Sequence, residues 1–240
     1  MVLGNVLISP DTQANLGPAG VAELKASLWP VDCQTCGRPL GSQPAALAVD
    51  DVTVFAWASL HHKQCRAPGW NSGPVITQTN AGVSHRSRLV MMPTQKSPRA
   101  AEPDDAMPMM VVNPGMESVT LRRDHGRWRP QFHSVFTAAG MVPPGRKLRI
   151  HRPISGATAT LTPVTARITL ADRPGDVYES ELDAENAGGD PFRRAITGQG
   201  GIMLAVTHVV DPAADDGLAR QISSAMREGR MLCGWVALQA

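Results

Sequence analysis

The sequence predicts an α+β protein in two parts: a small N-terminal module, then a mostly antiparallel, β-rich domain with one C-terminal β-α-β crossover. Three observations predict this fold class. Cysteine and histidine residues in the first third are spaced like metal ligands, and short β-prone runs separated by Pro and Gly recur through the second half. Near the end, an apolar run (202–210), a helical pattern (218–226) and a second apolar run (231–238) follow one another, as in a crossover between parallel strands.

The N-terminal module contains a complete ligand set for one tetrahedral ion. Cys33 and Cys36 form a Cys-x2-Cys pair, and His62 and Cys65 follow as His-x2-Cys after 25 intervening residues. Zinc binds four nitrogen and sulfur donors that converge on one point. His61 is the alternative ligand, and we prefer His62 because the i, i+3 spacing is the commoner one. The sequence therefore predicts one zinc ion bound by three cysteines and one histidine.

The residues between the two ligand pairs predict how the module folds. Gly37 suits a tight knuckle after Cys36, where positive φ is often needed. Two β-prone runs then flank Asp50-Asp51, which predicts a hairpin with an acidic turn. Ser59 can cap a short helix that ends at Pro68 and that presents the second ligand pair on one face.

Knuckle, hairpin and short helix, in that order, are typical of a treble-clef zinc finger. The stretch from Cys33 to Cys65 resembles the first half of a LIM-type finger, which pairs Cys-x2-Cys with a later His-x2-Cys. The second finger that a LIM domain adds does not follow here. The resemblance covers roughly 40 of the 240 residues and implies a metal site rather than a LIM function.

Changes in amino-acid composition along the chain predict two domains and a linker between them. A short helix with Pro18 in its first turn leads into the zinc module, so the first domain covers 17–70. Residues 71–105 are rich in Ser, Thr, Pro, Gln and Asn, which predicts a polar linker or long loop, in which Arg88–Met92 is a candidate for a short strand. The α+β domain is predicted to cover 106–240.

A basic segment lies within a chain whose formal net charge is only +2. Residues 122–152 hold eight Lys or Arg and one Asp, and Trp128 stands among the first of them. Arginines interleaved with aromatic rings are typical of nucleic-acid-binding surfaces, where the cations bind phosphates and the rings stack on bases. The plainer interpretation is a strand whose arginines face water or pair with the acidic last third of the chain. The candidate nucleic-acid-binding residues are Arg122, Arg123, Arg127, Trp128, Arg129, Arg146, Lys147 and Arg149.

The predicted function follows from the zinc chemistry. Three thiolates and one imidazole close the coordination shell, whereas a catalytic zinc keeps an open position for water. We therefore expect a structural zinc ion in a non-catalytic protein-interaction or regulatory protein with a protein partner, and we assign no catalytic residues. A nucleic-acid-binding regulator that uses 122–152 is the first alternative.

A metal-dependent nuclease or hydrolase is the second alternative, because His61-His62 follow the predicted hairpin as in an HNH nuclease. The sequence has neither a Gly-x-Ser-x-Gly elbow nor a phosphate-binding loop of the Gly-x4-Gly-Lys type. It also has no basic secretory n-region and no apolar run near the ~20 residues of a membrane span. These features predict a cytoplasmic protein without membrane contact.

Overall fold

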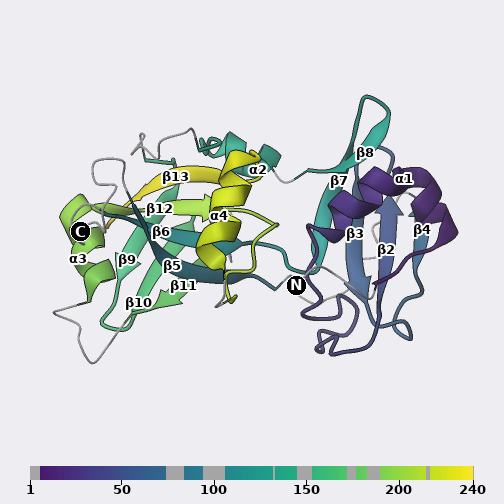
Figure 1. Ribbon diagram of the computed structural model, residues 1–240, viewed down its shortest axis with the longest axis horizontal. Helices are drawn as coiled ribbons and strands as arrows, with labels where there is room; N and C mark the ends of the chain where they lie inside the picture. The colour runs from purple at the N-terminus through teal and green to yellow at the C-terminus, as the bar shows by residue number, and fades with distance from the viewer. Residues whose placement is uncertain are drawn as a thin grey trace. The chain divides into compact units, whose positions relative to one another are not determined.

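The computed structural model describes residues 6–73, 84–93, 106–131, 133–144, 153–171, 177–182, 190–214 and 217–239. These residues form a mixed α+β fold of mostly strands with four helices (Figure 1). Contacts divide the chain into two compact units. Unit 1 combines Met1–His85 with Pro114–Phe132, and unit 2 combines Arg86–Asn113 with His133–Ala240.

The two units differ from the three predicted ranges at two places. Pro114–Phe132 falls in the range predicted for the second domain, but it belongs to unit 1. Arg86–Pro93 falls in the predicted linker, where it forms the candidate strand, and it belongs to unit 2. In both cases the pairing partner is distant in the sequence, and composition does not reveal such a partner.

Unit 1 is built on one sheet with the strand order β1-β2-β3-β7-β8. Its elements are β1 (Val6–Leu7), α1 (Pro10–Lys25), β2 (Ala45–Asp51), β3 (Ala56–His61), β4 (Gly69–Ser72), β7 (Ser118–Asp124) and β8 (Arg127–Pro130). β4 runs parallel to β2, whereas β3 is antiparallel to both β2 and β7. Helix α1 begins at the Ser9 cap and is interrupted at Gly17, so Pro18 starts its second half.

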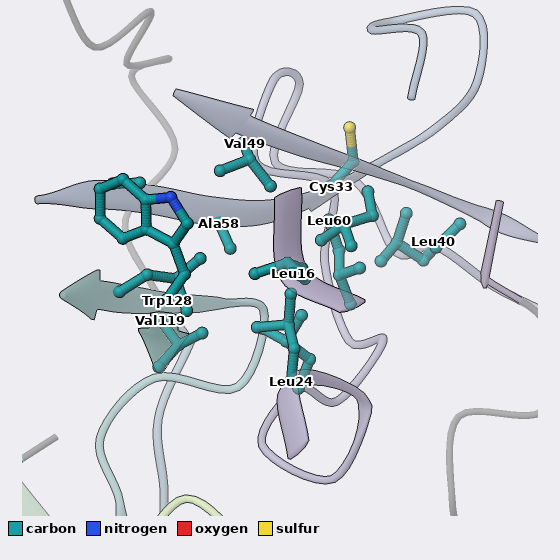
Figure 2. Packing of buried hydrophobic residues seen from close by; sticks show 14 residues of the cluster. Leu16, Leu24, Cys33, Leu40, Val49, Ala58, Leu60, Val119 and Trp128 are labelled. Carbon is teal, nitrogen blue, oxygen red and sulfur yellow. The ribbon is translucent and has the colours of Figure 1, made fainter. Parts of the chain in front are cut away.

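Alternating apolar residues of β2 and β3 face a core that α1 covers. Leu47 and Val49 of β2, and Ala58 and Leu60 of β3, lie in this cluster with Leu16 and Leu24 of the helix. Figure 2 shows these side chains converging, with Trp128 of β8 at one side and Cys33 at another. One of the four predicted metal ligands, Cys33, thus belongs to the core of unit 1.

Two predicted local structures in this region are wrong. The hairpin turn lies at Val52–Phe55 instead of at Asp50-Asp51, because both acidic residues are buried within β2 and have polar partners. The predicted helix after Ser59 is absent: β3 continues through His61, and a turn follows it. The treble-clef order is therefore not found, since its third element is missing.

The described residues of unit 2 form two sheets and three helices. One sheet has the order β13-β12-β6-β5, and the other has the order β11-β10-β9. Their strands are β5 (Arg86–Pro93), β6 (Ala106–Asn113), β9 (Ala157–Leu161), β10 (Thr165–Leu170), β11 (Val177–Glu181), β12 (Gly201–Val206) and β13 (Leu232–Ala237). The helices are α2 (His133–Ala138), α3 (Pro191–Gln199) and α4 (Leu218–Arg227).

The predicted C-terminal crossover is also wrong. β12 and β13 are antiparallel neighbours, with Ala205 opposite Cys233. Helix α4 connects them and packs its buried residues, such as Ile222, against the sheet. A connection of this length can return in either direction, so it does not fix strand polarity. The parallel partner of β12 is instead β6.

None of the helices within the described part of the chain is both long and apolar enough to cross a lipid bilayer.

Candidate metal centre

The four predicted ligands converge in unit 1. One donor atom from each of Cys33, Cys36, His62 and Cys65 lies within 4.8 Å of every other. The Cys36 Sγ is 3.5 Å from the His62 Nδ1, and the Cys65 Sγ is 3.9 Å from it. Tetrahedral zinc, with bonds of about 2.3 Å to sulfur and about 2.1 Å to nitrogen, separates these atoms by about 3.6 Å. The two distances from the His62 Nδ1 are thus close to those that a bound zinc ion requires.

The His62 ring is oriented for ligation through Nδ1. Its other nitrogen, Nε2, lies 3.0 Å from the carbonyl oxygen of Pro39, so an Nε2–H donates to that acceptor. This bond leaves the lone pair on Nδ1, which faces the sulfurs of Cys36 and Cys65. Metal-binding histidines commonly donate their second nitrogen to a carbonyl in this way.

Two backbone turns place the ligands. In the first, the Gly37 N–H donates to the Cys33 carbonyl at 2.8 Å, and Gly37 has the predicted positive φ of 68°. In the second, the N–H groups of Cys65 and Arg66 donate to the His62 carbonyl at 2.9 Å and 3.0 Å. The His62 N–H also lies 3.3 Å from the Cys33 Sγ, which links the turns. A turn, rather than a helix, therefore places His62 and Cys65 together.

His61 has a different role from the one considered in the sequence. It is buried at 1% exposure, and its Nδ1 and Nε2 lie 2.9 Å and 2.8 Å from the hydroxyls of Thr35 and Ser59. Burial, and then the charge of Arg66, lowers its pKa to about 4, so the ring is neutral at pH 7. Both nitrogens have hydroxyl partners, so His61 links the first turn to the sheet and lies outside the group of four converging donors.

The second turn is fixed by an ion pair. Arg66, next to the ligand Cys65, pairs with the buried Asp50 of β2. Asn71 of β4 donates to the same Asp50 oxygen at 3.2 Å. A buried carboxylate is expensive without such partners, so this contact ties the turn to two strands. Sequence reasoning missed it because it treated Asp50 as a turn residue.

A second buried carboxylate supports the chain ahead of the first turn. Glu117 is fully buried, and its two oxygens accept 3.0 Å hydrogen bonds from the N–H groups of Asp32 and Ser84. Burial raises the pKa of Glu117 above its ordinary value. The carboxylate thus joins three segments far apart in the sequence, and no local pattern predicts it.

The thiols differ in acidity. Hydrogen bonds from the Arg38 backbone N–H and then from its side chain lower the pKa of the exposed Cys36 to about 6. Burial, followed by the neighbouring thiols, raises the pKa of Cys65 to about 11. A coordinating thiol is deprotonated, so a cation bound among the sulfurs would oppose the effect on Cys65.

Replacing Thr35 by Val tests the anchoring role of His61. The substitution preserves shape but removes the hydroxyl partner of the buried Nδ1, so we expect unit 1 to lose about 1–2 kcal/mol of unfolding free energy. Metal content is expected to stay unchanged, because no ligand is altered. Denaturant unfolding followed by tryptophan fluorescence, with metal analysis of the same sample, measures both. Loss of metal in this variant would contradict the separation of His61 from the ligand set.

The first four predicted basic residues lie on the β7–β8 hairpin, and all are exposed: Arg122, Arg123, Arg127 and Arg129. Trp128 is instead buried at 3% exposure and contacts Trp70, with ring centroids 5.7 Å apart. It therefore offers no free ring face to a base. The remaining three predicted residues, Arg146, Lys147 and Arg149, lie outside the described residues.

The described residues thus combine an α+β fold with a Cys3His group that is able to hold a metal ion. No second group of three or more histidine, cysteine or acidic side chains converges among the residues that the structure describes. Comparison with protein-family models, with curated proteins and with solved structures yields no match.

Proposed function

We propose that the chain is a zinc-binding protein whose single Cys3His site is structural, and that it acts as a non-catalytic interaction or regulatory protein in the cytoplasm. The convergence of the four donor atoms within 4.8 Å supports this proposal most directly. Zinc is the metal of choice because thiolate and imidazole donors in a tetrahedral set favour it. Cys33 is buried in the core of unit 1, so the metal would hold core and turns together.

A structural role fits the donor set better than hydrolysis does. Four protein ligands leave no position for a water molecule, and three thiolates donate enough charge to weaken the metal as a Lewis acid. His61, which a nuclease would need as a free base, has both ring nitrogens bonded to hydroxyls. The proposed protein partner rests on this non-catalytic interpretation.

The ligand assignment is tested by comparing His62→Gln with His61→Gln. We expect the native protein and His61→Gln to contain one zinc ion per chain, because Gln can still donate to and accept from the Thr35 and Ser59 hydroxyls. His62→Gln should bind zinc more than about 100-fold more weakly, since loss of a ligand exceeds the effect of losing a ligand's hydrogen-bond partner.

The measurement is metal analysis by mass spectrometry, followed by competition with a chromogenic chelator. Replacement by Co²⁺ adds an independent readout, because thiolate-to-cobalt charge-transfer bands report sulfur ligation. A native protein purified without zinc that also fails to bind added zinc or cobalt would overturn the proposal. Retention of zinc by His62→Gln with loss in His61→Gln would reverse the histidine assignment.

A further inference from the structure

The tip of the β7–β8 hairpin extends beyond the sheet of unit 1. Pairing between β3 and β7 ends at Ala56 and Leu121, whereas β7 and β8 remain paired as far as Asp124 and Arg127. Figure 1 shows this hairpin, in teal, projecting past α1 and the other strands of its unit. Beyond Leu121, β7 therefore pairs only with β8 among the described strands, while one face of β8 packs against α1. We call this two-stranded segment, residues 122–129, the ribbon.

The ribbon has a firm base and a tight end. Trp128 packs in the core, and the Arg123 guanidinium carbon lies 4.8 Å from the centre of its ring. At the other end, His125 and Gly126 have φ values of 47° and 79°, the left-handed pair that a two-residue hairpin loop of type I′ requires. Both features hold the ribbon in one conformation, so its exposed side chains are presented on a rigid support.

One face of the ribbon concentrates positive charge. Arg122 lies directly opposite Arg129, and Arg127 lies opposite Asp124 on the same face. We call Arg122, Arg127 and Arg129 the basic face. Asp124 is the carboxylate nearest to it, with an oxygen 3.9 Å from the Arg129 Nε, and both side chains are more than half exposed. Three cations thus face solvent with one carboxylate among them.

The two arginines that face each other across the strands destabilise the hairpin. Like charges directly across two antiparallel strands repel each other, and a Thr pair there would favour the hairpin. An anion that bridges the two guanidinium groups turns this repulsion into attraction, and guanidinium groups bind phosphate oxygens through paired hydrogen bonds. A phosphate-bearing ligand would therefore relieve the repulsion between the two arginines.

We infer that the basic face binds the phosphate backbone of duplex DNA, with the ribbon entering the major groove. That groove is about 12 Å wide and admits a two-stranded β-ribbon, whereas the deep, narrow major groove of duplex RNA does not. Trp128 and Arg123 take no part, because one is buried and the other contacts its ring. Without an exposed ring for base stacking, single strands are the poorer ligand.

The test compares the native zinc-loaded chain with two double variants. Arg122→Thr/Arg129→Thr removes the opposed pair, whereas Arg220→Thr/Arg227→Thr removes two exposed arginines from α4 in unit 2 and keeps the same net charge. Fluorescence anisotropy of a labelled 20-base-pair DNA is measured from 50 to 200 mM salt, with duplex RNA, single-stranded DNA and polyglutamate as competitors.

For the native chain we expect a dissociation constant on the order of micromolar at 50 mM salt and a slope of log K against log salt of about −2.7, from three phosphate contacts. The hairpin variant should bind at least about 10-fold more weakly with a slope near −0.9, while the α4 variant behaves like the native chain. The hairpin variant should also unfold no earlier than the native chain, because its strands lose a repulsion.

No binding by the native chain at 50 mM salt, or equal binding by the hairpin variant, would overturn the inference. Equally strong competition by polyglutamate would assign the face to an acidic protein instead, and equal competition by duplex RNA would remove the groove argument. Zinc content measured on every sample separates these results from the metal proposal, since the hairpin can fail to bind DNA while the metal site remains loaded.

Discussion

Cys65→Ser is expected to abolish stoichiometric zinc binding and to lower the unfolding free energy of unit 1 by about 4 kcal/mol, when free zinc in the native sample is held at 1,000 times the dissociation constant. Serine cannot supply the thiolate whose Sγ lies 3.9 Å from the His62 Nδ1. Metal binding then no longer contributes to the stability of the folded state. Unit 1 should remain partly structured, because its apolar cluster from Leu16 to Trp128 does not depend on Cys65 alone.

Two probes separate the units in this experiment. Four of the five tryptophans (Trp29, Trp57, Trp70 and Trp128) belong to unit 1, so fluorescence mainly reports that unit. Cys233 belongs to unit 2, and burial raises its pKa to about 12, so it alkylates only after unit 2 opens. Peptide mass spectrometry identifies the labelled cysteine.

The matched control is Gln64→Ser, which changes an exposed residue in the same turn without altering a ligand. It should keep its zinc and its stability. Cys233 should be protected equally in the native protein, in Cys65→Ser and in the control. Full zinc occupancy in Cys65→Ser would contradict the ligand assignment, and early labelling of Cys233 in that variant would contradict the separate stability of unit 2.

Gly201→Ala is expected to destabilise unit 2 by about 3 kcal/mol, at the upper end of the usual cost of overpacking. Gly201 begins β12, where an added Cβ would overlap the carbonyl oxygen of Val236 and lie 2.7 Å from a ring carbon of Trp235. The backbone of β13 cannot move aside without breaking the ladder between the two strands. Urea unfolding followed by Cys233 alkylation measures the change.

Gly198→Ala is the control on the neighbouring helix. Gly198 lies in α3, and an added Cβ would meet no atom within 4 Å. Alanine there should therefore stabilise the helix by about 0.5–1 kcal/mol. Equal changes in unfolding free energy for the two substitutions would show that the close approach of β13 to Gly201 does not determine the stability of unit 2.

The Cys3His group could be predicted from the sequence because the residue types and their spacing indicate it directly. Two Cys or His pairs, each separated by two residues, indicate a metal site whatever structure carries them, and the structure brings all four side chains together. The local conformation could not be predicted in the same way. The spacing of His62 and Cys65 fits a turn as well as a helix, and Ser59, a good helix cap, instead bonds His61 from within β3.

Long-range features escaped prediction for a different reason. Asp50 and Glu117 are buried because Arg66, Asn71 and distant backbone N–H groups compensate them, and these partners are apparent only in three dimensions. The antiparallel pairing of β12 with β13 depends on how the chain returns across the sheet. Local pattern predicts the strands themselves but not their direction.

The interrupted course of unit 1 has a consequence for synthesis on the ribosome. All four metal ligands precede residue 66, but Val119, Leu121 and Trp128 of the same core follow the β5–β6 segment of the other unit. The four donor side chains are therefore synthesised before the strands that complete the core around Cys33. A metal ion bound at that stage would join two turns beside a sheet that still lacks β7, the antiparallel partner of β3.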